Sequence, residues 1–394
     1  MKKFFLDLGY QPLANNYLSK FKKKQTKYKL KIYFDSKSKL VSISKKIPSK
    51  KMFNSKYPYR SSMSKTMKTS FNELSKKIKK KFKPKMLLEI GSNDGVLLKN
   101  FKKKTAIGIE PCSNLAEITN KLGYKTYDKY WNYNTASFLK EKYNKFDVIF
   151  SANTITHIPN LNEVFKSLEH LLAPNGVIII EDPSLLDCLK INSYDQFYNE
   201  HIYVFSAIAL KNILKKYNLE LFDVENLKTH GGSLRYFIKR KKNINIKINS
   251  SVNAQLKKEY KFGIDRFKTY KKFSKNVSIS KNKLVKLLKT IKNKKNKIIG
   301  YGATAKATTV LNYCNIDNKI IDYFVDTTPD KINKFMPNKN IKIYKYSQNN
   351  IQHANYIFLG AWNFQKEILK KEKRFIQKGG KFITHIPFAK IIIN

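Results

Sequence analysis

Two acidic turns that follow apolar runs carry the residue types of a nucleoside-binding site. The segment Glu89-Ile-Gly91-Ser-Asn93-Asp94-Gly95 ends one such run, and its glycines let a ligand approach the backbone at the start of a helix. Glu110 ends the next run about 20 residues later, where one carboxylate can accept both hydroxyls of a ribose. Either acid alone fits an ordinary turn, but together with Asn153 after a later run they predict a nucleoside site.

A second glycine-rich turn lies near the C-terminus. Gly300-Tyr-Gly302-Ala-Thr-Ala305-Lys306 fits the pattern GxGxxA, and Asp322 or Asp326 follows about 20 residues later, as in dinucleotide-binding folds. This turn keeps open the hypothesis of an NAD-dependent oxidoreductase. The structural alternative is a Rossmann-like unit that has the tight turn without a cofactor.

Strands and helices must position these turns. From Met86 onward, short apolar runs alternate with helical or loop segments, which is the βαβ pattern of a parallel sheet. Helices are predicted at 160–172 and 206–217, and strands at 219–227 and 233–240. We predict an α/β protein in four parts: an N-terminal lobe at 1–84, an α/β unit at 85–240, a helical connector at 241–296 and a second α/β unit at 297–394.

Composition and charge limit the classes of protein. The 394 residues suit two or three domains. The net charge of +51 comes mostly from lysine, whereas nucleic-acid surfaces favour the arginine fork. The apolar stretches are too short to span a membrane, and polar residues interrupt any signal-peptide core. We therefore expect a cytoplasmic protein that binds no nucleic acid, inserts into no membrane and uses its charge to steer an anionic metabolite.

Successive motifs resemble those of one enzyme family. GSNDG resembles motif I of class I S-adenosylmethionine-dependent methyltransferases. Further motifs resemble, in order, the signatures of three-part sugar C-methyltransferases that act on nucleotide-linked ketosugars: DLGYQPLANNYL, YPYRSS, EIGSNDG, YNEHIYVFS, HGGSLR, GYGATAKATTVLNYC and AWNF. The resemblance implies a seven-stranded Rossmann-like methyltransferase sheet, a second Rossmann-like C-terminal domain and a small N-terminal lobe.

The N-terminal lobe departs from that family's pattern. Family members usually bind zinc there through two cysteine pairs. By this resemblance the chain begins at the stretch that would follow the first pair, and 33–43, where the second pair would fall, contains no cysteine. Cys112, Cys188 and Cys314 lie far apart, with no CxxC motif. We therefore predict a metal-free lobe, degenerate or truncated, and no disulfide framework.

Tyr198-Asn199-Glu200-His201 matches the family's catalytic Tyr-x-Glu-His segment. A carbon beside a ketone becomes nucleophilic only after a base removes its proton, and histidine has a suitable pKa near neutrality. The resemblance thus assigns His201 as the base. Tyr198 and Glu200 would position the sugar and the imidazole and steady the enolate oxygen. The alternative is a surface turn with a solvated histidine.

The resemblance also implies binding residues. S-adenosylmethionine is expected to contact Gly91, Asn93, Asp94, Gly95, Glu110 and Asn153. The substrate is expected to contact Tyr57, Tyr59, His230, Arg235 and Lys306. His157 fits either the donor pocket or a structural role, the tyrosines fit packing equally well, and a simple hairpin turn is the alternative for His230 and Arg235.

Together these inferences predict a C-methyltransferase that uses S-adenosylmethionine. Its expected substrate is a nucleotide-linked deoxysugar, methylated beside its ketone through an enolate and by in-line transfer without a metal. One alternative is a methyltransferase of another small molecule or of nucleic acid on the same donor fold. The other is the oxidoreductase suggested by the C-terminal turn.

Overall fold

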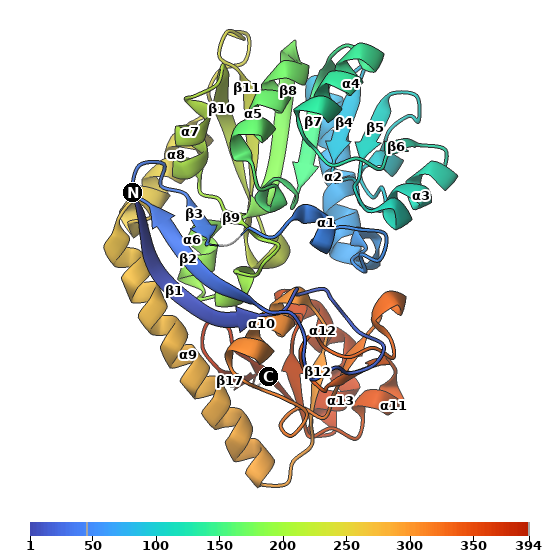
Figure 1. Cartoon of the computed structure of the whole chain (residues 1–394), viewed down its shortest axis with the longest axis vertical. Coiled ribbons are helices and arrows are strands. Elements are labelled where there is room, and N and C mark those ends of the chain that lie inside the picture. Colours follow the sequence, from blue (N-terminus) through green and yellow to red (C-terminus); the bar gives the residue numbers. More distant parts are fainter. Residues whose placement is uncertain (45, 393–394) are drawn as a thin grey trace.

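Two parallel sheets face each other across the molecule, and an antiparallel sheet joins them along one side (Figure 1). The computed structural model describes residues 1–44 and 46–392. No helix in these two ranges is long and apolar enough to cross a membrane. The predicted α/β fold class is confirmed.

The first α/β unit has a seven-stranded sheet in the order β10-β11-β8-β7-β4-β5-β6. Its strands are parallel except for β11, which runs antiparallel to both of its neighbours. The strands are β4 (Leu87–Ile90), β5 (Ala106–Ile109), β6 (Lys125–Tyr127), β7 (Phe146–Ala152), β8 (Leu172–Pro183), β10 (Leu219–Leu227) and β11 (Ser233–Arg240). The central strands β4 and β5 are buried along their whole length, which explains their apolar runs.

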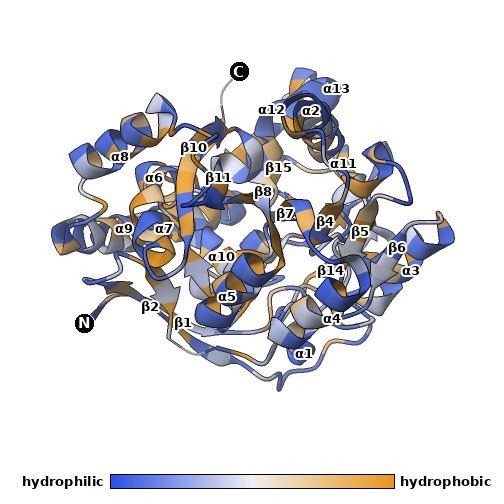
Figure 2. Cartoon of the chain, turned by 90° about the horizontal axis from the view of Figure 1, so that it is seen from above, coloured by the Kyte–Doolittle hydropathy of each residue, from blue (hydrophilic) through white to orange (hydrophobic). Residues whose placement is uncertain are grey.

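Helices cover this sheet on both sides, with hydrophilic residues facing outward (Figure 2). They are α2 (Lys65–Phe82), α3 (Ser113–Lys121), α4 (Tyr133–Tyr143), α5 (Leu161–Leu171) and α7 (Ala207–Leu214), whereas α6 (Leu185–Lys190) lies just beyond the carboxyl end of β8. The side chain of Asn160 accepts a hydrogen bond from the Glu163 N–H and so caps α5, as expected of a helix that begins there. The prediction of a helix over 206–217 was wrong at its end, because α7 stops at Leu214.

The second α/β unit has a six-stranded sheet in the order β14-β13-β12-β15-β16-β17, parallel except for β17. Its strands are β12 (Ile298–Tyr301), β13 (Tyr323–Asp326), β14 (Lys342–Lys345), β15 (Tyr356–Leu359), β16 (Lys381–Thr384) and β17 (Lys390–Ile392). Its helices are α10 (Ala305–Tyr313), α11 (Gln348–Ile351), α12 (Gln365–Lys371) and α13 (Lys373–Gln377). The connector contains α8 (Ser250–Phe262) and the long α9 (Phe267–Asn293).

The N-terminal lobe is a four-stranded antiparallel sheet in the order β1-β2-β3-β9, followed by the short helix α1 (Ser49–Met52). Its strands are β1 (Lys2–Gln11), β2 (Tyr28–Asp35), β3 (Val41–Ile43) and β9 (Tyr203–Val204). Because β9 comes from beyond residue 200, the lobe is completed by the chain just after the YNEH motif. Nothing in the local sequence pattern predicted this pairing.

Candidate functional site

A cavity of about 800 Å³ lies where the carboxyl ends of the two parallel sheets face each other. Ligands of open α/β sheets bind at this edge. Residues from the N-terminal lobe and both α/β units line it, among them Tyr57, Tyr59, Gly91, Asn93, Glu110, Asn153, His157, Tyr198, His201, His230, Lys306 and Lys331. The structure therefore brings most of the sequence-predicted site residues together.

Gly91 makes the turn after β4 possible. Its φ is +72°, a conformation that side chains other than glycine rarely adopt, and an added Cβ would lie 2.0 Å from the Thr154 Oγ1. Glycine at this position therefore lets the turn pack tightly against Thr154, and both residues line the cavity.

Glu110 fixes the shape of the same turn. Its two carboxylate oxygens accept hydrogen bonds from the Asn93 N–H at 2.8 Å and the Cys112 N–H at 2.9 Å. Burial raises the pKa of this carboxyl group. Each oxygen keeps a second lone pair, so Glu110 can still accept a ligand hydroxyl from the cavity.

Glu89 is a cavity residue that the site prediction missed. Its carboxylate is buried at the end of β4, and no described residue forms a hydrogen bond with its Oε2. Burial raises its pKa well above the usual range, with a further contribution from Glu110. A cationic ligand group would stabilise the ionised form, since an unpaired buried carboxylate is costly. The sequence signal was the acid two residues before Gly91.

Asp94 and Gly95 lie behind the turn rather than at the cavity. Asp94 accepts a hydrogen bond from the Ser62 N–H at 3.2 Å, and the neighbouring Asn93 Oδ1 accepts one from the Ser61 N–H at 2.9 Å. A Cβ on Gly95 would lie 2.4 Å from the Thr119 side chain, so this glycine permits packing against α3. The structure thus gives Asp94 a role in holding the YRSS segment to the turn, and Gly95 a role in packing the turn against α3.

The imidazole of His201 is held from both sides. Its Nδ1 lies 2.8 Å from the Gln196 carbonyl oxygen, and its Nε2 lies 2.6 Å from the Tyr198 hydroxyl. A carbonyl oxygen only accepts, so Nδ1 carries the hydrogen and Nε2 is the acceptor. Burial lowers the pKa of His201 well below its usual value, and the nearby His157 lowers it further. The imidazole is therefore neutral at pH 7, as a base must be.

Glu200 lies behind this pair and outside the cavity lining. It accepts hydrogen bonds from the Asn15 amide at 2.8 Å and the Tyr57 hydroxyl at 3.1 Å. Burial raises the pKa of Glu200 to about 7. Both donors line the cavity, so Glu200 connects the YNEH segment to two parts of the N-terminal lobe.

His157 stacks between two other rings at the cavity wall. Its centroid lies 5.2 Å from that of Phe53 and 5.2 Å from that of His201. Burial lowers its pKa to about 3, which keeps it uncharged beside the His201 imidazole.

His230 and Lys306 meet at the boundary between the two α/β units. The Asn153 amide donates to the His230 Nε2 at 3.3 Å, and the Lys306 ammonium donates to the His230 carbonyl at 3.3 Å. Burial lowers the pKa of Lys306 to about 8. His230 also has a φ of +55°, so its backbone is held in a left-handed turn by these contacts.

Arg235 does not reach the cavity, which departs from the sequence expectation. It lies on β11 opposite Glu181 of β8 and Glu225 of β10, and its guanidinium pairs with them at 2.9 and 3.0 Å. Both pairings follow from strand register. Because its charge is already neutralised inside the sheet, Arg235 is not free to bind a diphosphate.

Side chains of the protein itself form hydrogen bonds with the backbone of the C-terminal glycine turn. Asp326 accepts hydrogen bonds from the Ala303 N–H and the Thr328 N–H, both at 2.8 Å. The Lys331 ammonium and the Tyr17 hydroxyl both donate to the Ala303 carbonyl, at 2.9 and 2.7 Å. In a dinucleotide-binding fold, the acid at this strand end binds ribose hydroxyls. Here Asp326 holds the turn and, unlike Glu110, also forms an ion pair with a lysine, Lys331, at 3.5 Å.

The described residues contain no group of three or more His, Cys, Asp or Glu side chains that could hold a metal ion. The three cysteines are free and buried. The metal-free lobe stays a prediction.

Comparison with known proteins gives the class of the molecule. The family model described as "Methyltransferase domain" matches residues 59–224, and the one described as "C-methyltransferase C-terminal domain" matches residues 228–387. The chain belongs to the S-adenosylmethionine-dependent C-methyltransferases, and S-adenosylmethionine is its cofactor. The predicted enzyme class and cofactor are thereby confirmed.

Among curated proteins, the chain is similar to the C-methyltransferase NovU of Streptomyces niveus. The two are 28% identical over 309 residues, which cover 78% of this chain and 73% of NovU. Among solved structures, it is similar to an S-adenosylmethionine-dependent methyltransferase of Clostridium acetobutylicum, with a TM-score of 0.33, 14% identity and coverage of 44% of this chain and 91% of the other. The PH0226 protein of Pyrococcus horikoshii gives a TM-score of 0.36, 15% identity and coverage of 46% and 94%.

Proposed function

We propose that the protein methylates the carbon adjacent to the ketone of a nucleotide-linked deoxysugar, with His201 as the base. The observation that carries this proposal is the fixed tautomer of His201 at the cavity. Its Nδ1–H is committed to the Gln196 carbonyl, so the Nε2 lone pair is the one available to take a proton.

Tyr198 supports the same step. Its hydroxyl now donates to the His201 Nε2, and burial raises its pKa well above the usual value, so it stays protonated. When a substrate C–H takes its place at Nε2, the hydroxyl is free to donate to the ketone oxygen. Hydrogen bonding to an oxygen on which negative charge develops lowers the barrier to enolate formation.

The residues at the turn after β4, which we call the donor turn, fit S-adenosylmethionine. Gly91 lines the cavity without a side chain that would obstruct a ligand, and the unpaired Glu89 oxygen suits a cationic group. We propose that Gly91, Asn93 and Glu110 hold the cofactor, with Asn153 at the far side of the same pocket. When bound, the cofactor supplies a methyl group on a cationic sulfur, and the enolate carbon is the acceptor that the protein must align with it.

The opposite wall of the cavity supports the proposed substrate class. Lys306 lines it from the second α/β unit, and a nucleoside diphosphate needs cationic or N–H donors of this kind. Tyr57 and Tyr59 line it from the N-terminal lobe. We assign the nucleotide to the C-terminal side and the sugar to the space between His201 and the donor turn.

The four sequence divisions are proposed as functional parts. Residues 85–240 would bind the donor, 297–394 would bind the nucleotide, 1–84 would close the sugar site, and 241–296 would connect the two α/β units. Tyr57 and Asn15 support the third assignment, since their hydrogen bonds to Glu200 bring the lobe to the base.

The test is incubation with a methyl-labelled donor and a panel of nucleotide-linked 4-ketosugars. Products are read by mass, and deuterium exchange from solvent is read at the carbon beside the ketone. His201→Ala should abolish both exchange and transfer, while calorimetry shows unchanged binding of S-adenosylhomocysteine, because the base acts only on the sugar.

Two results would contradict the proposal. Full exchange by His201→Ala would remove His201 from the mechanism. Methylation at oxygen or nitrogen in the wild type would remove the enolate step altogether.

A further inference from the structure

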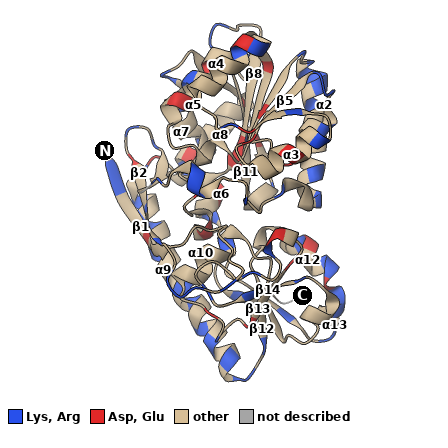
Figure 3. Cartoon of the chain, turned by 45° about the vertical axis from the view of Figure 1, so that its right-hand side comes forward, with Lys and Arg blue, Asp and Glu red and all other residues tan. Residues whose placement is uncertain are grey.

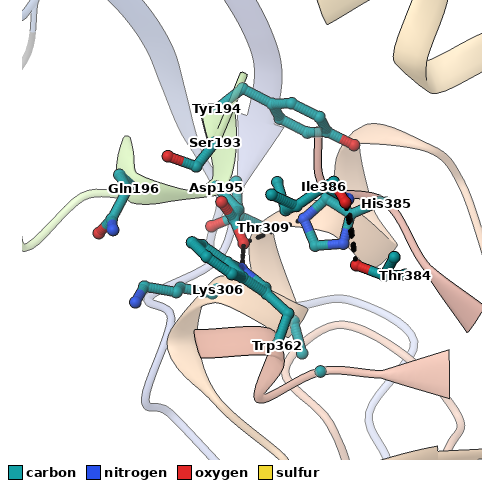
Figure 4. Close-up of polar contacts among 12 residues, drawn as sticks. Ser193, Tyr194, Asp195, Gln196, Lys306, Thr309, Trp362, Thr384, His385 and Ile386 are labelled. Atoms are coloured by element: carbon teal, nitrogen blue, oxygen red, sulfur yellow. Dashed lines mark hydrogen bonds and ion pairs between the residues drawn. The ribbon is translucent and has the colours of Figure 1, made fainter. Parts of the chain in front are cut away.

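Asp195 is a buried carboxylate close to the base that the proposed mechanism does not use. It has no exposed surface, and its Oδ2 accepts hydrogen bonds from the Trp362 Nε1–H at 2.6 Å and the His385 Nε2 at 3.1 Å. Figure 4 shows the indole and the imidazole converging on Asp195. Both partners come from the C-terminal unit, more than 160 residues further along the chain. This cluster of Asp195, Trp362 and His385 is called the clamp below.

The clamp holds an ionised carboxylate. Burial alone would raise the pKa of Asp195, but the charge and hydrogen bond of His385, with further contributions from Lys306 and Trp362, outweigh it and bring the pKa below the usual value. Hydrogen bonds to a charged acceptor are about twice as strong as those between neutral groups. The clamp therefore ties the 193–201 segment firmly to the C-terminal unit.

Trp362 also contacts the turn at Gly231, between β10 and β11. A Cβ on Gly231 would lie 2.3 Å from the indole ring, so the glycine turn packs directly against it. The Lys306 ammonium lies 5.2 Å from the indole centroid, within range of a cation–π contact, and donates to the His230 carbonyl. Trp362 thus contacts both the 193–201 segment and the turn at Gly231.

The link from the clamp to the base is one residue long. Gln196 follows Asp195, and its carbonyl oxygen accepts the hydrogen bond from the His201 Nδ1–H. The Gln196 side-chain amide donates to the His230 carbonyl at 2.7 Å. Gln196 is therefore held in two ways. Its neighbour Asp195 is bound by the clamp, and its own side chain binds the His230 carbonyl.

We propose that Asp195 is a positioning residue, held by Trp362 and His385, which fixes the Gln196 carbonyl and thereby keeps His201 in the tautomer whose Nε2 faces the substrate. The base is then competent only while the C-terminal unit is docked on the 193–201 segment. This inference rests on the proposed role of His201.

The expected effect is on turnover. A free neutral imidazole exchanges between its two tautomers, and only one leaves Nε2 as the acceptor here. Misplacement of a catalytic group by about 1 Å costs on the order of 100-fold in rate. Loosening the clamp should therefore lower kcat by about 10- to 100-fold and leave the affinity for S-adenosylhomocysteine unchanged.

The main test compares Trp362→Phe and Asp195→Asn with Tyr323→Phe as the matched control. Trp362→Phe removes one N–H donor and keeps an aromatic ring. Tyr323→Phe removes one O–H donor, to the Asn350 carbonyl, in the same unit but away from the cavity. The kcat and KM for methyl transfer and the rate of deuterium exchange are measured for each. The clamp variants should lose kcat and exchange together, and the control should keep both.

A second measurement reports on the base without substrate. In protein labelled with 15N-histidine, the His201 resonances, identified by their loss in His201→Ala, should show the Nδ1–H tautomer in the wild type and in Tyr323→Phe. In the clamp variants the two nitrogens should shift toward tautomer averaging. His385→Gln, which keeps a donor, should retain more of the wild-type pattern than His385→Phe.

The outcomes separate the two proposals. If His201→Ala retains exchange, the proposed function fails, whatever the clamp variants do. If His201→Ala loses exchange but Trp362→Phe and Asp195→Asn keep the wild-type kcat and 15N pattern, the positioning role is overturned and the clamp is only structural. A loss of melting temperature without a change in the 15N pattern has the same meaning.

Discussion

Burial sets the protonation states around His201, residue by residue. The pKa values of His157 and His201 are lowered because a charged imidazole is poorly solvated inside the protein, and that of Glu200 is raised for the same reason. The result is a site with neutral imidazoles and a carboxyl group that titrates near neutrality. Perturbed groups that line a cavity, as His157 and His201 do, are typical of functional sites.

The raised pKa of Glu200 predicts a specific pH dependence of stability. Between its ordinary value of 4.5 and the folded value of about 7, the unfolded state loses its proton while the native state keeps it. The free energy of unfolding of the wild type should therefore fall relative to that of Glu200→Gln as pH rises through this window, and the difference should be constant above it. The 2.5 units between these values correspond to about 3 kcal/mol.

Denaturant unfolding at pH 5 and pH 8 checks this prediction. Glu117→Gln, at an exposed position of α3, should follow the wild type at both values. Parallel pH profiles for Glu200→Gln and the wild type would show that Glu200 titrates at its ordinary pKa in the folded protein.

At the scale of elements, the site is built from turns at strand ends. The turns after β4, β5 and β7 supply Gly91, Glu110 and Asn153. In the second unit, the first turn of α10, which follows β12, supplies Lys306, and the turn after β13 supplies Thr328. Parallel strands place their carboxyl ends along one edge, so residues far apart in the sequence converge without further adjustment. The shape of each turn then decides which groups face the ligand.

Gly91→Ala should disrupt donor binding through local geometry. The added Cβ meets Thr154 at 2.0 Å, and φ of +72° is unfavourable for alanine, so the turn must move. We expect the affinity for S-adenosylhomocysteine to fall at least about tenfold, as measured by calorimetry.

Gly379→Ala is the control for backbone conformation alone. Gly379 has a φ of +86° with nothing within 4 Å of an added Cβ. This variant should lose about 1 kcal/mol of stability and keep its affinity. If Gly91→Ala also keeps its affinity, the tight packing of Gly91 against Thr154 has no part in binding.

At the scale of the molecule, the cavity depends on contacts between the N-terminal lobe and the two α/β units. Tyr17 of the N-terminal lobe donates to Ala303, and Thr308 donates to the Ala14 carbonyl, so the lobe is attached to the C-terminal unit. Lysines and arginines lie on the outer helices of both units (Figure 3). The net charge of +51 therefore surrounds the site with a positive field.

This charge predicts electrostatic steering of an anionic substrate. The kcat/KM for the nucleotide-linked sugar should fall about tenfold between about 0.02 and about 0.5 M salt, while kcat stays constant, because salt screens long-range attraction. A ketosugar without the nucleotide is the neutral control, and its kcat/KM should be insensitive to salt. Equal salt dependence for both sugars would mean that the surface charge has no part in substrate capture.

The sequence by itself determined the features that depend on local spacing. Buried strands appear in the sequence as apolar runs, and the alternation of those runs with helical segments predicted the parallel sheets. Tyr198 and His201 are three residues apart, so their contact follows from one short turn. Glu110 could be placed beside the donor turn because neighbouring parallel strands end at the same edge.

Tertiary structure alone decided which polar groups are available to ligands. Arg235 is polar and close to a turn, yet strand register places it between Glu181 and Glu225 and removes it from the site. Glu200 meets Asn15 across 185 residues, and Asp195 meets His385 across 190. Contacts of this kind depend on how whole units pack, and packing leaves no periodic signal in the sequence around either partner. His201, the proposed base, could therefore be found in the sequence, whereas the distant residues that anchor its segment could not.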